Sequence, residues 1–221
     1  MKRCLIIGAS GGIGRAIHSI LEQQGAAVTS LSRSEDGLDL MDETATRAIL
    51  EQLSGPFDLV LVATGALEIA GAAPEKTIKS ISAQAMMDQF ALNAVGPALI
   101  LREAQYLLPR KGRSVFAVLS ARVGSIGDNH IGGWISYRAA KAAVNQIVRT
   151  SAIELARTHR DAICVALHPG TVATSFTEKY LSRYPNISPE MSAQNLLKVI
   201  GGLSSSDTGG FFDWAGKRVQ W

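Results

Sequence analysis

Tyr137 and Lys141 are the residues of this 221-residue sequence whose types and spacing best suggest acid–base chemistry. Side chains four residues apart lie on one face of a helix. A free phenol has a pKa of about 10, too high for a base at neutral pH, but a neighbouring ammonium favours the phenolate and lowers that pKa. Tyr137 is therefore a candidate to exchange a proton with an oxygen atom. The pair alone is also typical of an ordinary helix surface, so its position relative to other motifs matters.

A glycine-rich turn near the N-terminus supplies that context, because it follows an apolar run and precedes a helical pattern. Gly8 would permit a tight turn, Gly12 the close approach of a phosphate, and Gly14 the close packing of helix on strand. Backbone N–H groups and the helix dipole favour negative charge at such a helix N-terminus. The turn therefore predicts a bound dinucleotide pyrophosphate, the alternative being a merely flexible turn.

Arg33 and Asp39, further along the chain, are candidates to contact the adenosine half of the dinucleotide. Arg33 lies where NAD-binding units place an acidic residue on the ribose hydroxyls, and a guanidinium there suits a 2′-phosphate. We therefore expect NADP(H) in preference to NAD(H), the alternative being a solvated surface arginine. Asp39 could accept a hydrogen bond from the adenine amino group or could cap the segment that follows, and the sequence leaves both open.

The elements that must position these residues alternate short apolar runs with longer amphipathic ones. This order predicts an α/β fold in one domain, residues 1–221, with a doubly wound parallel sheet of about seven strands and helices on both faces. The expected strands are residues 3–7, 27–31, 38–40, 58–62, 114–119, 162–167 and 210–213. The expected helices are residues 12–24, 43–53, 83–108, 135–158 and 189–203.

Composition excludes several classes of function. A net charge of only +3 gives no strong positive electrostatic field for a phosphate backbone, and an aromatic share of 6% gives no evident surface for base stacking. Nucleic acid is therefore not the expected partner. No apolar run reaches the roughly 18 residues of a membrane span, and the first apolar run is too short for a signal peptide. Cys4 and Cys164 are expected to be buried thiols in a cytoplasmic protein. The histidines show no metal-ligand spacing, so we expect no metal.

Together these motifs resemble the short-chain dehydrogenase/reductase family, and the resemblance covers the whole chain. It rests on the ordered set Gly8, Gly12, Gly14, Asp39, Leu40, Asn93, Tyr137, Lys141 and residues 169–174. It implies a Rossmann-type fold and hydride transfer between a nicotinamide and a small carbonyl or alcohol substrate. More narrowly, residues 120–129 and 209–214 resemble the C-factor-like branch, which is related to sniffer-type carbonyl reductases.

The resemblance also implies roles for particular residues. Tyr137 would be the general acid or base and Lys141 would also bind the nicotinamide ribose. Asn93 would help hold a water that links the lysine to solvent, and Pro97 lacks the N–H that the Asn93 carbonyl would bind in a helix. Thr174 would form a hydrogen bond with the carboxamide group of the nicotinamide. The implied cofactor contacts are Gly8, Ser10, Gly12, Ile13, Gly14, Arg33, Asp39, Leu40, Gly65, Pro169, Gly170 and Thr174.

The family's catalytic serine has no direct counterpart, since Ala121 occupies the position that usually carries it. The hydroxyl must come from Ser120 or Ser125, and we expect Ser120. Adjacent residues of a strand point to opposite faces, so this expectation includes a local kink. A rival interpretation is a dinucleotide-binding sensor or signalling protein with weak or no turnover. A second rival is another Rossmann enzyme. The Tyr137/Lys141 pair and Thr174 argue against a methyltransferase, and the short carboxyl-terminal portion is expected to leave little room for an epimerase's sugar-nucleotide domain.

The substrate is left unidentified by the sequence. Residues 175–188, where the family places a lid, carry Phe176, Tyr180 and Tyr184, and Trp134 lies in another loop. These aromatic side chains suggest an apolar pocket wall, although they could equally be subunit contacts. By analogy with the family we expect a homodimer or homotetramer through the helices at residues 83–108 and 135–158, with no nucleic-acid or membrane partner.

Overall fold

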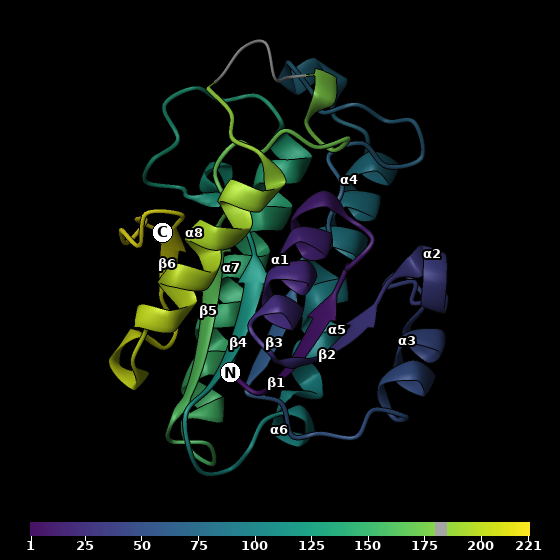
Figure 1. Ribbon diagram of the computed structural model, residues 1–221. Coiled ribbons are helices and arrows are strands. Elements are labelled where there is room, and N and C mark those ends of the chain that lie inside the picture. The colour runs from purple at the N-terminus through teal and green to yellow at the C-terminus, as the bar shows by residue number, and fades with distance from the viewer. Residues whose placement is uncertain (180–184) are drawn as a thin grey trace.

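The computed structural model describes residues 1–179 and 185–221. Its sheet has six parallel strands in the order β2-β1-β3-β4-β5-β6 (Figure 1). The strands are β1 (Arg3–Ile7), β2 (Ala27–Leu31), β3 (Leu59–Val62), β4 (Ser114–Leu119), β5 (Ala162–His168) and β6 (Phe211–Asp213). The expected α/β fold with a parallel sheet is therefore confirmed, with one strand fewer than expected.

The strand expected at residues 38–40 is absent. The alternation of apolar residues in this segment does indicate which side chains are buried, because Leu38 and Leu40 are each only 3% exposed. The backbone, however, closes local turns: the N–H of Leu38 binds the carbonyl of Ser32, and the N–H of Asp42 binds the carbonyl of Asp39. A short helix, α2 (Arg33–Asp36), precedes the segment. The two leucines thus fill the core without pairing with a strand.

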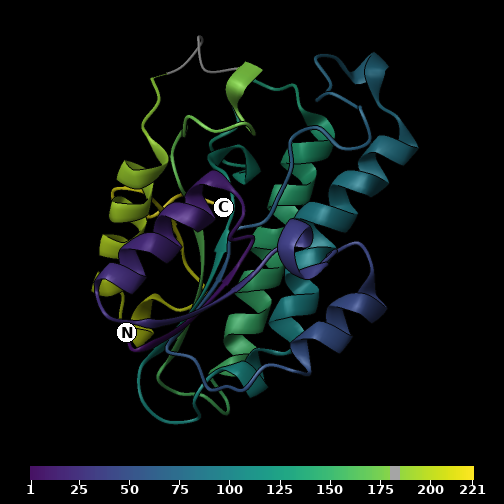
Figure 2. The ribbon, with the colours of Figure 1, turned by 45° about the vertical axis from the view of Figure 1, so that its right-hand side comes forward.

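Helices cover both faces of the sheet, as Figure 2 shows. Helices α1 (Gly12–Gln23) and α8 (Pro189–Gly202) pack on one face, against side chains such as Ile6 and Leu61. Helices α3 (Glu43–Leu50) and α7 (Ile135–Leu155) pack on the other face with the helices that lie between them, against side chains such as Leu5 and Val60. Each central strand is thus apolar on both faces, as expected of a parallel sheet.

The long helix expected at residues 83–108 is broken into four parts. They are α4 (Ala83–Phe90), a π-helix (Ala91–Val95), α5 (Gly96–Arg102) and α6 (Ala104–Leu107). Pro97 has no N–H for the carbonyl of Asn93, so the regular ladder cannot continue there. The chain widens instead, and the N–H of Gly96 binds the carbonyl of Ala91. Asn93 therefore lies inside a π-helical turn, a feature that often marks functional sites.

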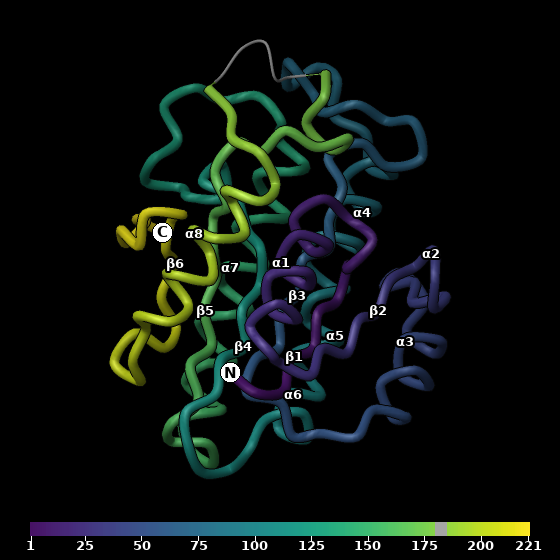
Figure 3. The backbone as a smooth tube through the Cα atoms, viewed as in Figure 1, coloured from purple at the N-terminus to yellow at the C-terminus, as the bar shows by residue number. Residues whose placement is uncertain are grey.

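The loops that follow the carboxyl ends of β1, β3, β4 and β5 gather at one edge of the sheet (Figure 3). In doubly wound α/β folds this edge is where ligands bind. In the part of the chain described, no helix combines the length and the apolar character needed to cross a bilayer.

Candidate active site

The glycine turn has the close contacts expected from the sequence. Gly8 has a φ of +91° and leads the chain from β1 into α1. A Cβ on Gly14 would lie 2.3 Å from the carbonyl oxygen of Gly8, so only glycine lets α1 begin so close to the turn. A Cβ on Gly12 would lie 2.6 Å from the methyl carbon of Thr174. The turn after β1 and the segment after β5 therefore meet at Gly12.

This cradle fits a dinucleotide. Gly11, the N-cap residue of α1, provides no side-chain hydrogen bond to the first N–H groups of that helix. Those groups and the positive end of the helix dipole can receive a phosphate. The hydroxyl oxygen of Thr64, just beyond β3, is buried without a hydrogen-bond partner in the protein, as expected of a polar atom that faces a ligand site.

The other cofactor candidates lie along the same edge. Arg33 is exposed as the first residue of α2. Asp39 uses one carboxylate oxygen to accept the N–H of Met41 at 3.0 Å, which is the capping alternative that the sequence left open. Leu40 packs against Gly96, so closely that a Cβ on Gly96 would lie 2.8 Å from the Cβ of Leu40. The side chain of Leu40 therefore belongs to the core. Gly170 has a φ of +84° in the turn after β5.

Tyr137 and Lys141 lie on the buried face of α7, with exposed fractions of 5% and 3%. The Nζ of Lys141 donates to the carbonyl of Leu119, the last residue of β4, at 3.0 Å. The same Nζ lies 5.8 Å from the centre of the Tyr137 ring. A Cβ on Gly65 would lie 3.5 Å from this Nζ and 2.8 Å from Oδ1 of Asn93. The ends of β3 and β4 thus converge on the lysine.

The electrostatics of the pair differ from the sequence expectation. Burial raises the pKa of the Tyr137 phenol above its ordinary value and lowers the pKa of Lys141 to about 8. The expected lowering of the phenol's pKa by the ammonium is therefore corrected, because burial disfavours the charged phenolate and raises the pKa instead. Tyr137 is protonated at neutral pH, and this is the form that can donate a proton to a carbonyl oxygen.

Asn93 is completely buried and binds the loop after β3 with its side chain. Its Oδ1 accepts the N–H of Ala66 at 3.3 Å, and its Nδ2 donates to the carbonyl of Ala66 at 2.9 Å and to Oε1 of Gln89 at 2.7 Å. The side chain therefore fixes the loop that contains Gly65. The backbone carbonyl of Asn93 lies four residues before Pro97, which has no N–H to bind it. The expected role of Asn93 in holding a water remains a prediction.

The kink expected at Ser120 is wrong. The strand ladder continues through this residue, whose N–H binds the carbonyl of Leu167 at 2.7 Å, and Ala121 is extended with φ −144° and ψ 147°. Because the alternation of a regular strand persists, Ser120 faces α7, where its hydroxyl donates to Oδ1 of Asn145 at 2.6 Å. The hydroxyl oxygen of Ser125 accepts the N–H of Asp128 at 3.1 Å.

Several residues at the site were missed in the sequence. Asn145 follows Tyr137 and Lys141 at the same interval of four, and that periodicity could have identified it. Gln89 lies four residues before Asn93, whose Nδ2 donates to it, so the same interval could have identified it. Glu75 gave no local signal, because long-range folding brings it to the site. Trp134 and Phe176 lie beside Tyr137, with ring centres 6.3 and 6.2 Å from its own. Tyr180 and Tyr184 lie outside the described residues.

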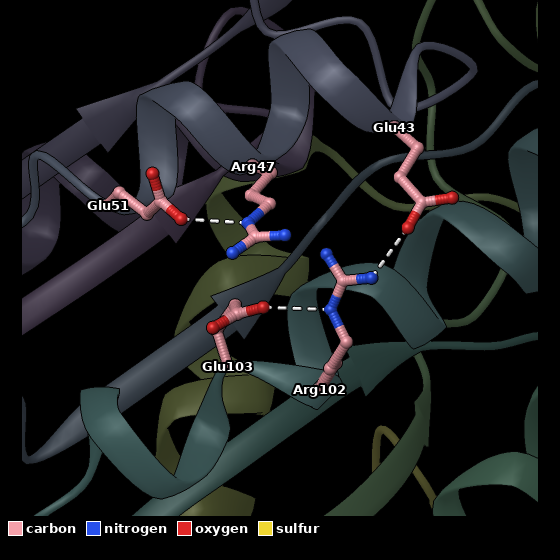
Figure 4. A network of polar contacts seen from close by, with 5 residues as sticks. All are labelled: Glu43, Arg47, Glu51, Arg102 and Glu103. Atoms are coloured by element: carbon pink, nitrogen blue, oxygen red, sulfur yellow. Dashed lines mark hydrogen bonds and ion pairs between the residues drawn. The ribbon is translucent and has the colours of Figure 1, made fainter.

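A surface hollow of about 570 Å³ lies elsewhere, between α3 and the α5–α6 region near the amino ends of β3 and β4. Its charged side chains bind one another (Figure 4): Arg47 to Glu51 at 2.7 Å, and Arg102 to Glu43 at 2.6 Å and Glu103 at 2.8 Å. This compensated network gives no reason to place the chemistry there. The described residues contain no cluster of three or more histidine, cysteine or carboxylate side chains able to hold a metal.

Comparison with known proteins agrees with this geometry. A family model described as short chain dehydrogenase matches residues 37–185. The chain is 29% identical, over 234 residues and 100% of both chains, to 1-hydroxy-2-glutathionyl-2-methyl-3-butene dehydrogenase of Rhodococcus sp. (strain AD45). It is 36% identical over 140 residues to the C-signal of Myxococcus xanthus, covering 62% of this chain and 78% of that protein.

Solved structures give the same result. The chain is similar to a putative short-chain dehydrogenase/reductase from Burkholderia multivorans with bound NADP, with a TM-score of 0.80, 25% identity, and coverage of 100% of this chain and 99% of that one. The carbonyl reductase Sniffer of D. melanogaster has a similar fold, with a TM-score of 0.81, 20% identity and coverage of 100% of both chains.

Proposed function

Because this chain belongs to the short-chain dehydrogenase/reductase family and is thereby an NAD(P)-dependent oxidoreductase, we propose that it reduces a small carbonyl compound with NADPH, using Tyr137 as the acid. We take residues 1–221 as one such domain. The observation that carries the proposal is the burial of Tyr137 together with Lys141 beside the ends of β3 and β4. The glycine turn opens at the same edge of the sheet, so a nicotinamide and a phenol can meet there.

The preference for NADPH rests on Arg33. Its exposed guanidinium follows the end of β2, where it can pair with a 2′-phosphate. The Burkholderia multivorans relative, whose structure contains NADP, supports the same choice. The pyrophosphate binds at Gly8, Ser10, Gly12, Ile13 and Gly14, the adenine side at Asp39 and Leu40, and the nicotinamide side at Gly65, Pro169, Gly170 and Thr174.

In the proposed reaction the bound nicotinamide supplies a hydride to the carbonyl carbon. Tyr137 donates its phenolic proton to the carbonyl oxygen, so the product is an alcohol. Lys141, which is charged below its pKa of about 8, stabilises the phenolate that remains. Asn93 holds a water through which the proton is replaced. Ser120 remains the proposed donor to the carbonyl oxygen. Because the backbone has no kink that would turn it toward the usual serine position, this role requires its hydroxyl to leave Oδ1 of Asn145 and rotate toward the substrate.

The substrate is small and at least partly apolar in this proposal. Trp134 and Phe176 lie against the ring of Tyr137 and form the wall that the rest of the substrate contacts. By analogy with the family, the protein assembles as a homodimer or homotetramer through the helices that include α4 and α7. Two buried, unpaired cysteines favour a cytoplasmic location.

The second candidate function is a dinucleotide-binding sensor or signalling protein with little turnover. Ala121 at the usual serine position and the bond between Ser120 and Asn145 favour it. The discriminating experiment is NADPH consumption with a panel of aldehydes, ketones and quinones, alongside direct titration of NADPH. Consumption with any of these carbonyls supports the enzyme. Tight binding without consumption at high protein concentration supports the sensor.

A further inference from the structure

We propose that Glu75 is a positioning residue for Tyr137, an inference that rests on the proposed function. Glu75 lies in the loop between β3 and α4 and is only 6% exposed. Its Oε2 accepts the N–H of Ser136 at 3.2 Å, its Oε1 accepts the hydroxyl of Ser136, and its backbone carbonyl accepts the N–H of Trp134 at 2.6 Å. Three hydrogen bonds thus join one loop residue to the start of α7.

These bonds provide the cap that α7 lacks locally. Trp134, the N-cap residue, makes no side-chain capping bond and has left-handed backbone angles of φ 51° and ψ 42°. Gly132 and Gly133 before it also have positive φ values, of +70° and +68°. A side chain disfavours this conformation, so contacts from outside must hold Trp134 in it. The carboxylate of Glu75 also places negative charge at the positive end of the helix dipole.

Tyr137 is the residue directly after Ser136, so the position of the first helical turn decides where the phenol lies. Glu75, Ser136 and Tyr137 line one small cavity of about 10 Å³, so the carboxylate, the first turn of α7 and the phenol lie close together. The start of the Glu75 loop is anchored, because Gln89 donates to the carbonyl of Leu67 at 2.9 Å and Asn93 binds Ala66. Glu75 therefore connects the loop after β3 to the catalytic helix.

The variants that test this role most directly are Glu75→Ala and Glu75→Gln. Alanine removes both side-chain bonds, and we expect kcat to fall by about 10- to 100-fold, the loss typical of a reacting group displaced by about 1 Å. The Kd of NADPH should be unchanged, because the glycine turn is not disturbed. Glutamine should retain most of kcat, since its amide oxygen can accept the Ser136 N–H and its amide nitrogen can donate to the Ser136 hydroxyl.

Two further variants separate positioning from general loss of stability. Asp42→Ala removes the side-chain cap of α3, a bond of 3.0 Å to the N–H of Ala45, and should lower thermal stability without lowering kcat. Ser136→Ala keeps the Glu75 carboxylate and removes one bond to it, so we expect a smaller loss of kcat. Hydrogen exchange over residues 133–140 should accelerate in Glu75→Ala and Ser136→Ala, and not in Asp42→Ala.

The inference is overturned if folded Glu75→Ala has the wild-type kcat, or if Gln and Ala lose kcat equally. Should Glu75→Ala fail to fold, an unchanged kcat and unchanged exchange in Ser136→Ala overturn it instead. Failure of the proposed function looks different, because wild-type protein would then consume no NADPH with any carbonyl. Hydrogen exchange over residues 133–140 would still report whether Glu75 holds the start of α7.

Discussion

Ser120 donates its hydroxyl proton to Oδ1 of Asn145 at 2.6 Å, and both residues are buried. Ser120 follows β4, whereas Asn145 lies one turn beyond Lys141 on α7, so the bond connects the central strand to the catalytic helix. A hydroxyl in this position can serve a substrate only by exchanging one acceptor for another. Ala121 leaves the usual position of the serine without a hydroxyl.

Ser120→Ala should therefore have two effects. We expect kcat to fall, and we expect the free energy of unfolding to fall by about 1–3 kcal/mol, because Oδ1 of Asn145 is left buried without its donor. Ser125→Ala is the matched comparison and should keep kcat. Steady-state kinetics and urea unfolding of both variants check this. Full activity in Ser120→Ala combined with a loss in Ser125→Ala would transfer the role to Ser125.

Lys141 predicts a pH dependence of stability with a defined sign. Burial lowers its pKa from 10.5 to about 8, so between these values the unfolded chain binds the proton and the folded chain does not. Wild-type stability therefore gains a contribution as pH rises through this window. The free energy of unfolding of Lys141→Met minus that of wild type should fall by on the order of 3 kcal/mol from pH 8 to 10.5.

The control for this measurement is Lys111→Met, which changes an exposed lysine. Its difference from wild type should stay constant over the same range of pH. A difference for Lys141→Met that is equally independent of pH would show that the ammonium of Lys141 suffers no desolvation in the folded protein.

Arg33 predicts a change in cofactor choice. Arg33→Asp should weaken NADPH binding by about tenfold or more, at least ~1.4 kcal/mol, while NADH binding changes far less. An acidic residue in the first turn of α2 suits the helix dipole, so the fold should be retained. Fluorescence titration of both cofactors measures the two Kd values, with Arg160→Asp as an exposed control. Equal losses for NADPH and NADH would refute the assignment.

Gly12 and Thr174 predict a clash that can be relieved separately from cofactor binding. Gly12→Ala should lower thermal stability, because the new Cβ would lie 2.6 Å from the Thr174 methyl carbon, and it should weaken NADPH binding. The double variant Gly12→Ala/Thr174→Ser lacks that methyl group and should recover stability without recovering NADPH affinity. Recovery of both properties would mean that Gly12 does not contact the phosphate.

The sequence predicted the features that depend on local periodicity. The strands around the glycine turn and the Tyr137/Lys141 face of α7 follow from spacing. The missing N–H of Pro97 was visible in the sequence, but the helix was still expected to run unbroken over residues 83–108. Leu38 and Leu40 alternate like a strand because they are buried, yet pairing is a property of the backbone that this pattern does not report. Sequence patterns measure burial better than they measure backbone partners.

The parts that escaped prediction depend on contacts between distant segments. Glu75 reaches the start of α7 across 61 positions of sequence, and no feature of its own loop indicates that partner. The direction of the Tyr137 pKa shift also escaped prediction, because the spacing of four shows the neighbouring ammonium but not the burial that raises the phenol's pKa. Both depend on how the loops after β3 and β4 close over α7.

The central claim is that the buried phenol of Tyr137 gives its proton to the substrate oxygen. Its most direct test is Tyr137→Phe in a single-turnover assay of NADPH oxidation with a carbonyl that the wild type reduces. We expect a rate lower by about 10²- to 10⁴-fold, with unchanged NADPH affinity and thermal stability near that of wild type. A Tyr137→Phe protein that binds NADPH normally and oxidises it at the wild-type rate would show that the phenol is not the proton donor.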